Sequence, residues 1–208
     1  MRAVMISIQP KWVEKIANGE KTIEVRKTAP KLETPFKCYI YCTKPDVKSR
    51  VVIGSMAFYN DELYRTIDGE IKYGSSIELM ACPPESYSRD NFLNGKVIGE
   101  FICDKIFNTN DWIYSDEIAH IFTEKNMCLS YKELAEYLNG KEGYCWHISA
   151  LKIYDEPKDI SEFNTLCKMP KEVNCENCPF YDWYEAKCVG RKVTRPPKGW
   201  CYVEEIRE

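Results

Sequence analysis

Three charged side chains near the N-terminus have a spacing that suits ligand binding: Lys21, Glu24 and Arg26, within residues 19–26 (GEKTIEVR). If residues 22–27 form a strand, alternation places Glu24 and Arg26 on one face and Ile23 and Val25 on the other. Lys21 then lies at the strand entrance, from where its long side chain can reach either face. A carboxylate between two cations can hold a polar, often anionic ligand. The alternative is a solvent-exposed edge strand with ordinary ion pairs.

Four cysteines in the C-terminal part have a spacing that suits a metal: Cys167, Cys175, Cys178 and Cys188, in the pattern C-x7-C-x2-C-x9-C. Two thiolates separated by two residues can bind one metal from a tight turn, and two more complete a tetrahedron. The segment has few aliphatic residues, so a metal would supply the organisation that a core cannot. The sequence therefore predicts a structural zinc site. A four-cysteine iron–sulfur cluster, unligated or redox-active thiols, and Cys201 in place of Cys167 remain alternatives.

Three further residues are candidates for the ligand site. Glu100 interrupts an apolar strand-like stretch, so it either faces outward or points inward and pairs with Lys21 or Arg26. Tyr144 and Trp146 share one face of a later strand, and Cys145 and His147 share the other. One of these pairs could line a pocket mouth and stack a base, the alternative being core packing.

Other residues that often carry chemistry favour structural roles here. His120 and His147 are the only histidines, and neither has a Ser or Cys partner at a spacing typical of nucleophilic catalysis. Trp12 is predicted to anchor the core in preference to serving as a base-stacking platform.

Composition bounds the class of protein. The 208 residues, 44% of them hydrophobic, suit one domain with an appendage or two small domains. The net charge of −3 gives no global sign of nucleic-acid binding. However, residues 10–50 contain ten Lys or Arg against five acids, and residues 185–200 contain five against one. If these segments share a face, the protein carries a basic patch; otherwise they are solvated surface.

The sequence contains no stretch typical of a signal peptide or a membrane span. Its eleven cysteines are an odd number, and several lie within apolar strand-like runs. We therefore expect a cytoplasmic protein with mostly reduced thiols and no membrane partner.

Strands and a few helices are expected to position these residues. Periodicity predicts strands over residues 2–8, 22–27, 36–42, 51–58, 97–107 and 144–154, and hairpins or irregular structure over residues 59–95. A helix is predicted from Pro10, with Gly19 as its stop. Another is predicted within residues 111–125. Ser130 and Glu133 form a capping box for a third helix that Gly140 ends.

The motif at residues 19–26 resembles the G-x-K-x-x-E-x-R signature of ASCH domains, within the PUA-like superfamily. Four further stretches carry the resemblance: residues 38–43 (CYIYCT), 95–101 (GKVIGEF), 143–148 (GYCWHI) and 197–204 (PKGWCYVE). The chain is most similar to phage and phage-like bacterial ASCH proteins. The resemblance implies an α+β fold, a small mixed PUA-like β-barrel with flanking helices, to which a Cys-rich metal-binding appendage is added. We expect the barrel over residues 1–155, with an insertion at about 45–95, and a module over residues 156–208 that packs back on it.

The resemblance also implies a function. PUA-like domains commonly bind RNA or single modified bases in a cleft between barrel and helices. ASCH domains have been proposed to be RNA-binding modules. Some small members are hydrolases that cleave an amide on acylated cytidine with a Lys, a Thr and a Glu, and others are ribonucleases. The Lys matches Lys21, whereas the Thr position falls on Glu24 and the Glu position on Lys125. Two of the three groups therefore differ in this chain.

Three hypotheses follow. In the first, the protein binds RNA or a modified nucleotide: Arg26 contacts phosphate, Glu24 accepts hydrogen bonds from exocyclic amines, and Lys21 positions the ligand. In the second, it is a hydrolase of a modified nucleoside or of RNA, with Lys21 as base and Glu24 relaying a proton. In the third, it is an interaction protein that docks through the Cys-rich module.

Overall fold

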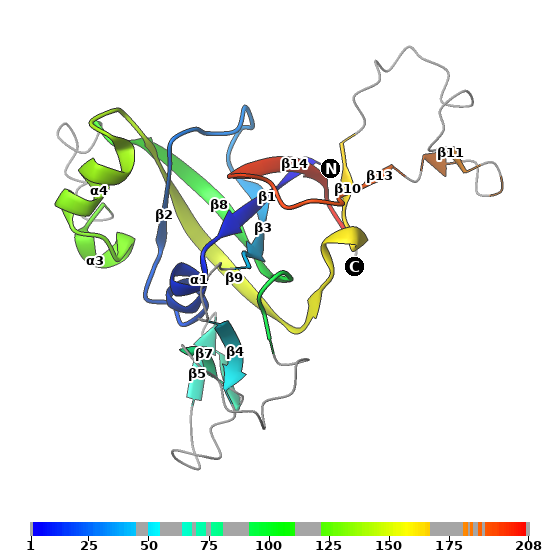
Figure 1. Ribbon diagram of the computed structural model, residues 1–208, viewed down its shortest axis with the longest axis horizontal. Coiled ribbons are helices and arrows are strands. Elements are labelled where there is room, and N and C mark those ends of the chain that lie inside the picture. The colour runs from blue at the N-terminus through cyan, green and yellow to red at the C-terminus, as the bar shows by residue number, and fades with distance from the viewer. Residues whose placement is uncertain are drawn as a thin grey trace.

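The computed structural model describes residues 2–44, 50–54, 64–67, 70–73, 76–80, 92–110, 122–166, 181–182, 184, 187–188 and 190–206. Its central element is a mixed eight-stranded sheet with the order β13-β10-β14-β1-β3-β8-β9-β2 (Figure 1). The strands are β1 (Arg2–Ile8), β2 (Ile23–Arg26), β3 (Phe36–Cys42), β8 (Val97–Asn108), β9 (Tyr144–Lys158), β10 (Asn164–Thr165), β13 (Arg191–Lys192) and β14 (Trp200–Glu204). The β1–β3 pair is parallel and the other pairs in this sheet are antiparallel. The architecture is therefore α+β, as the sequence predicted.

The sheet follows from the apolar runs of its strands. Every residue of β1 after Arg2 is buried, and so is every residue of β3 except Lys37. Strands with both faces covered read as continuous apolar runs. β8 and β9 are long and make the most extensive pairing in the fold. β2 pairs with β9 and is the last strand of the sheet, beside the helices.

Helix α1 (Pro10–Ala17) follows β1 directly and covers the core. Pro10 occupies the first turn, where its missing N–H costs nothing, and Val13, Ile16 and Ala17 are buried. Asn18 caps the C-terminus and Gly19 adopts φ +76°, a conformation that favours glycine. The chain then turns into β2. Trp12 packs against the main core while remaining partly exposed.

Two short helices pack on β2 from the other side. α3 (Glu124–Met127) and α4 (Tyr131–Leu138) bury Met127, Leu134 and Leu138 against Ile23 and Val25. The predicted capping box of α4 is present, with reciprocal hydrogen bonds between Ser130 and Glu133. The helix ends at Asn139, which takes the left-handed conformation one residue before the predicted Gly140.

Other elements are small. β4 (Arg50–Gly54) pairs with β7 (Ser76–Met80), and β5 (Tyr64–Ile67) pairs with β6 (Glu70–Tyr73). β4 overlaps the strand predicted over residues 51–58, and the predicted region of hairpins contains β7 and the β5–β6 pair. Asn18 donates to Ile77 O at 3.0 Å, which joins β7 to the end of α1. A 3-10 turn covers Ile160–Glu162, and β11 (Tyr181–Asp182) pairs with β12 (Lys187–Cys188). The helix predicted within residues 111–125 lies mostly outside the described residues, apart from α3.

The C-terminal strands join the same sheet as the N-terminal ones. β14 pairs with β1 over the register Arg2–Glu204 to Ile6–Trp200, and β10 and β13 continue the sheet beyond it. The division predicted between residues 155 and 156 falls inside β9. Among the helices that the structure describes, none has the length and apolar content needed to cross a bilayer.

Candidate functional site

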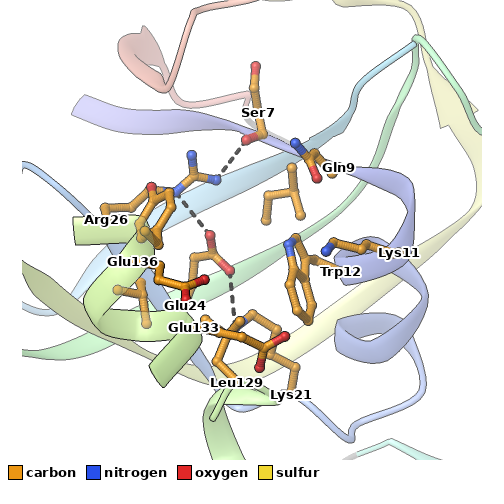
Figure 2. Close-up of a pocket in the computed structure, with 13 residues that line it drawn as sticks. Ser7, Gln9, Lys11, Trp12, Lys21, Glu24, Arg26, Leu129, Glu133 and Glu136 are labelled. Atoms are coloured by element: carbon orange, nitrogen blue, oxygen red, sulfur yellow. Dashed lines mark hydrogen bonds and ion pairs between the residues drawn. The ribbon is translucent and has the colours of Figure 1, made fainter. Parts of the chain in front are cut away.

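A cavity of about 410 Å³ opens between β1, α1, β2 and α4 (Figure 2). Its volume lies within the range of about 300–1,000 Å³ common for small-molecule sites. The lining residues come from these four elements and from the turns beside them: Ser7, Ile8, Gln9, Lys11, Trp12, Lys21, Glu24, Val25, Arg26, Leu129, Glu133, Glu136 and Tyr137. The three charged residues of the sequence motif thus lie in the wall of one hollow.

Lys21 is almost fully buried, with 2% of its surface exposed. Its Nζ donates to Met127 O at 2.5 Å and lies 3.6 Å from Glu24 Oε2 and 5.2 Å from the centre of the Trp12 ring. The turn after α1 delivers Lys21 to this place, and the α3 carbonyl fixes the ammonium group there. Lys21 therefore forms the floor of the cavity, between β2 and α3.

Glu24 lies between the two cations, as the strand alternation predicted, and only 5% of its surface is exposed. Its Oε1 lies 3.0 Å from Arg26 Nε, although the Nε–H is not aligned well enough to count as a hydrogen bond. Its Oε2 receives no hydrogen bond from any described residue. We call Glu24 Oε2 the open acceptor. Figure 2 shows this carboxylate between Arg26 and Lys21, facing the hollow that Trp12 borders.

Arg26 connects β2 to the end of β1. Its Nη2 donates to Ser7 O at 2.6 Å, and its side chain is 12% exposed. The guanidinium therefore holds the Glu24 side of the cavity against β1. With Lys21 and Arg26 cationic and Glu24 anionic, the buried group carries a net positive charge.

An aromatic wall borders the charged group. Trp12 lies beside Lys21, and Lys11 Nζ lies 4.3 Å from the centre of the Trp12 ring. Lys11 is exposed, so it stands at the rim. A flat ligand that enters the cavity would meet an indole on one side and the open acceptor at its base.

The opposite wall comes from α4. Glu133, Glu136 and Tyr137 share a face of α4 that adjoins the face of its buried leucines. Hydrogen bonds from the Ser130 backbone and side chain lower the pKa of Glu133. Burial is the main cause that raises the pKa of the Tyr137 phenol. The charge of Glu24 also raises this pKa, whereas the charge of Arg26 lowers it. Lys27 Nζ lies 5.1 Å from the Tyr137 ring centre, so this wall also has a cation at its edge.

No protein-family model matches the chain, and no curated protein matches it. Three solved structures of the ASCH protein from Zymomonas mobilis are similar to it. The wild-type structure has 15% identity and a TM-score of 0.43, over 98% of this chain and 88% of that one. A Ser-to-Ala mutant has 16% identity and a TM-score of 0.42 (98% and 89%), and a Tyr-to-Phe mutant has 14% and 0.44 (76% and 76%). All three carry the name of the family whose signature residues 19–26 resemble.

Glu100 does not belong to the described lining of the cavity. Its Oε1 binds Lys37 Nζ at 3.0 Å and its Oε2 accepts from the Tyr154 hydroxyl at 2.6 Å. The prediction that an inward Glu100 would pair with Lys21 or Arg26 is therefore wrong. β3, which carries Lys37, lies beside β8, whereas β9 separates β8 from β2 in the sheet.

Tyr144 and Trp146 are also absent from the described cavity wall. Trp146 has no exposed surface and packs against Phe36 and Trp200, with ring centres 6.0 and 6.1 Å away. Tyr144 is partly buried against the same core. The prediction that this pair stacks a base at the pocket mouth is wrong because β9 turns that face toward the main core. The alternative of core packing is confirmed.

His147 and Lys125 also lie outside the described wall of the cavity. His147 Nδ1 lies 2.7 Å from Asp104 Oδ1, in a part-exposed pair, and His120 falls outside the described residues. Lys125, at the position of the hydrolase Glu, is exposed on α3 and does not line the cavity.

The predicted metal ligands fall largely outside the described residues. This holds for Cys167, Cys175 and Cys178, whereas Cys188 ends β12, opposite Tyr181. Within the described part of the chain, no group of three or more His, Cys, Asp or Glu could hold a metal. Cys201 is partly buried in β14, and this burial raises its pKa.

Sequence reasoning missed the α4 wall and the Ser7–Gln9 edge. The helical period gives Glu133, Glu136 and Tyr137 one common face, and that signal was present in the sequence. Nothing local indicates that this face borders β2. The packing of Leu134 and Leu138 on Ile23 and Val25 is a long-range contact, and it brings the polar face to the cavity edge.

Proposed function

We propose that this cavity binds a nucleobase or nucleoside, either as a modified nucleotide or within RNA. The observation that carries the proposal is the open acceptor. A buried carboxylate oxygen that accepts no hydrogen bond, with Lys21 Nζ 3.6 Å away, costs free energy, and a ligand N–H would recover it once a lining side chain moves to admit it. Exocyclic amino groups and protonated ring nitrogens of nucleobases are donors of this kind.

The surrounding groups suit the same ligand. The Trp12 ring provides a flat apolar surface, and stacking on such a ring contributes about 1–3 kcal/mol per base. A volume of about 410 Å³ is adequate for a base with its ribose. Lys21 and Arg26 keep Glu24 in place. The lining as a whole contains three cations (Lys11, Lys21, Arg26) and three carboxylates (Glu24, Glu133, Glu136), so its formal charges balance, which suits an uncharged base or nucleoside.

The contacts of Lys21 favour binding over catalysis. Its Nζ is engaged by Met127 O and lies beside Glu24, so a role as base or nucleophile would require it to leave both. Its position fits a residue that orients the carboxylate. Hydrolysis of a modified nucleoside or of RNA remains the alternative, and it is an outcome of the test.

The test is calorimetric titration of the protein with a panel of nucleosides and nucleoside monophosphates, repeated with Glu24→Gln. We expect one or more ligands to bind, and Glu24→Gln to weaken binding about 10- to 100-fold, the value of a hydrogen bond to a charged group. Absence of binding across the panel would refute the proposal.

Lys21→Met separates binding from turnover. If the protein only binds its ligand, Lys21→Met lowers the affinity, and chromatography shows no product with the wild type or the variant. Product formation by the wild type that Lys21→Met abolishes, with binding retained, would replace the proposal with the hydrolase.

We also propose that Cys167, Cys175, Cys178 and Cys188 hold a structural zinc ion. The support is their spacing and the chemistry of four thiolates. Cys188 lies on a strand that pairs with residues 181–182. Cys201 fits less well because it packs against a core cluster.

Metal analysis of the purified protein tests the zinc proposal. We expect about one zinc per chain and its loss in Cys178→Ser, with Cys201→Ser as the matched control that retains it. Iron with visible absorbance would indicate the iron–sulfur alternative. A stably folded protein without metal would rule out the site.

A further inference from the structure

Two basic segments that are far apart in the sequence lie side by side. One is residues 27–31, which follow β2, and the other is residues 195–200, which lead into β14. Trp200 Nε1 donates to Thr28 Oγ1 at 3.0 Å, and the Lys31 N–H donates to the Tyr202 hydroxyl at 2.7 Å. We call the surface formed by these two segments the basic seam.

The basic seam is continuous with the cavity wall through Ser7. Ser7 lines the cavity, its Oγ donates to Pro197 O at 2.7 Å, and its N–H donates to Gly199 O at 2.8 Å. Its own carbonyl accepts from Arg26. Residues 197–199 are therefore one residue away from the charged group of the site.

Charge differs sharply between the two sides of the cavity. The seam presents exposed Lys31, Arg195 and Lys198 and contains no acidic residue within its two segments, whereas its Lys27 lies toward α4, 5.1 Å from the Tyr137 ring centre. Across the cavity, the α4 wall presents Glu133 and Glu136. A polyanion that has one base in the cavity would be repelled on the α4 side and attracted on the seam side.

From these contacts we infer that the basic seam binds the phosphates of a single-stranded polynucleotide whose base occupies the cavity. The inference rests on the proposed function and extends it: the ligand is a segment of a strand, and it leaves the cavity past Ser7 over residues 195–200. Phosphate contacts of this kind fix position and register without reading sequence. The proline pair at 196–197 limits the freedom of the seam before binding, which lowers the entropy cost of forming these contacts.

The test uses fluorescence anisotropy with a labelled, mixed-sequence oligoribonucleotide of about eight residues, a length within the range that single-strand sites cover. Affinity is measured against salt concentration for the wild type, Arg195→Ala, Lys198→Ala and the double variant. Lys132→Ala, an exposed lysine of α4 that does not line the cavity, is the matched control. All of these side chains are exposed, and thermal unfolding checks that each variant folds.

We expect each seam variant to weaken oligonucleotide binding up to about fivefold, and to make the salt dependence shallower by about 0.7 in log–log slope. The Lys132→Ala slope should equal that of the wild type. The same seam variants should bind an uncharged nucleoside as the wild type does, because they leave the cavity unchanged.

The outcomes separate the two proposals. Oligonucleotide binding no tighter than nucleoside binding, or a salt slope unaffected by Arg195→Ala and Lys198→Ala, would overturn the seam and leave the cavity proposal standing. Oligonucleotide binding that is indifferent to Glu24→Gln would overturn the proposed function of the cavity, whatever the seam variants do.

Discussion

Glu24 and Glu100 are two carboxylates that interrupt apolar strands and pair with lysine, yet they lie in different surroundings. Both oxygens of Glu100 are engaged, one by Lys37 and one by Tyr154. At Glu24, one oxygen contacts Arg26 and the other is the open acceptor at the edge of a cavity. Similar sequence patterns thus produce a self-contained ionic group in one place and an incomplete one in the other. An incomplete buried group is the better candidate for ligand binding.

The two lysines should differ most in what they contribute to stability. Lys21→Ala removes a fully buried cation, leaving Met127 O and Glu24 without it, so we expect a loss of about 3–5 kcal/mol in the free energy of unfolding. Lys37 is more exposed and Glu100 retains Tyr154, so Lys37→Ala should cost about 1 kcal/mol or less. Urea denaturation measures both. Equal losses would mean that the two groups are energetically alike.

The two glutamates should differ in their effect on ligand binding. Glu24→Gln should weaken nucleoside binding about 10- to 100-fold, whereas Glu100→Gln, the matched control, should leave affinity unchanged. Calorimetry on both variants gives the values. A similar drop in affinity for Glu100→Gln would show that replacing Glu by Gln weakens binding through a general loosening of the sheet.

Alkaline pH should destabilise both regions, because each has a buried thiol nearby. Burial raises the pKa of Cys145, next to β2, and of Cys103, on the strand of Glu100, from 9.0 to about 12. Since the folded state holds these protons more tightly, the stabilisation is complete below pH 9 and declines as pH rises toward 12. At pH 10 each thiol should account for about 1 kcal/mol of lost stability.

Urea midpoints near pH 8 and pH 10 measure the loss. Cys145→Ala and Cys103→Ala should each reduce the loss of stability between pH 8 and pH 10 by about the contribution of one thiol. A midpoint that does not change with pH in the wild type would contradict the assigned burial of both thiols.

The smallest expected effect concerns α4, which borders the Glu24 cavity only. Ser130→Ala removes the capping box and should cost about 1 kcal/mol of stability. Because α4 carries Glu133 and Tyr137, affinity for the nucleoside should fall slightly. Lys132→Ala, elsewhere on α4, controls for a general surface effect. An unchanged unfolding midpoint would indicate that α4 does not depend on its cap.

Local patterns anticipated much of the fold. The alternation in residues 23–26, the Pro10 start of α1 and the Ser130–Glu133 capping box are encoded within a few residues, and all are present. The relation of Glu24 to Arg26 follows from the strand period alone. These features need no knowledge of distant partners.

The rest depended on contacts between distant segments. Strand order is not visible in the sequence, so the sequence alone leaves open whether Glu100 faces outward or pairs with Lys21 or Arg26. It also leaves open whether Trp146 stacks a base or packs in the core, because its burial depends on Phe36 and Trp200. The α4 wall and the seam likewise depend on tertiary packing. The predicted cysteine site lies mostly outside the described residues and remains a prediction.

The most direct measurement is a crystal structure of the protein with a bound nucleoside from the calorimetric panel. We predict that its base lies against Trp12, with a ligand nitrogen about 2.7–3.2 Å from Glu24 Oε2 and the Glu100 group unchanged. A ligand bound elsewhere, with water as the sole added neighbour of Glu24 Oε2, would contradict the proposed role of Glu24 in binding.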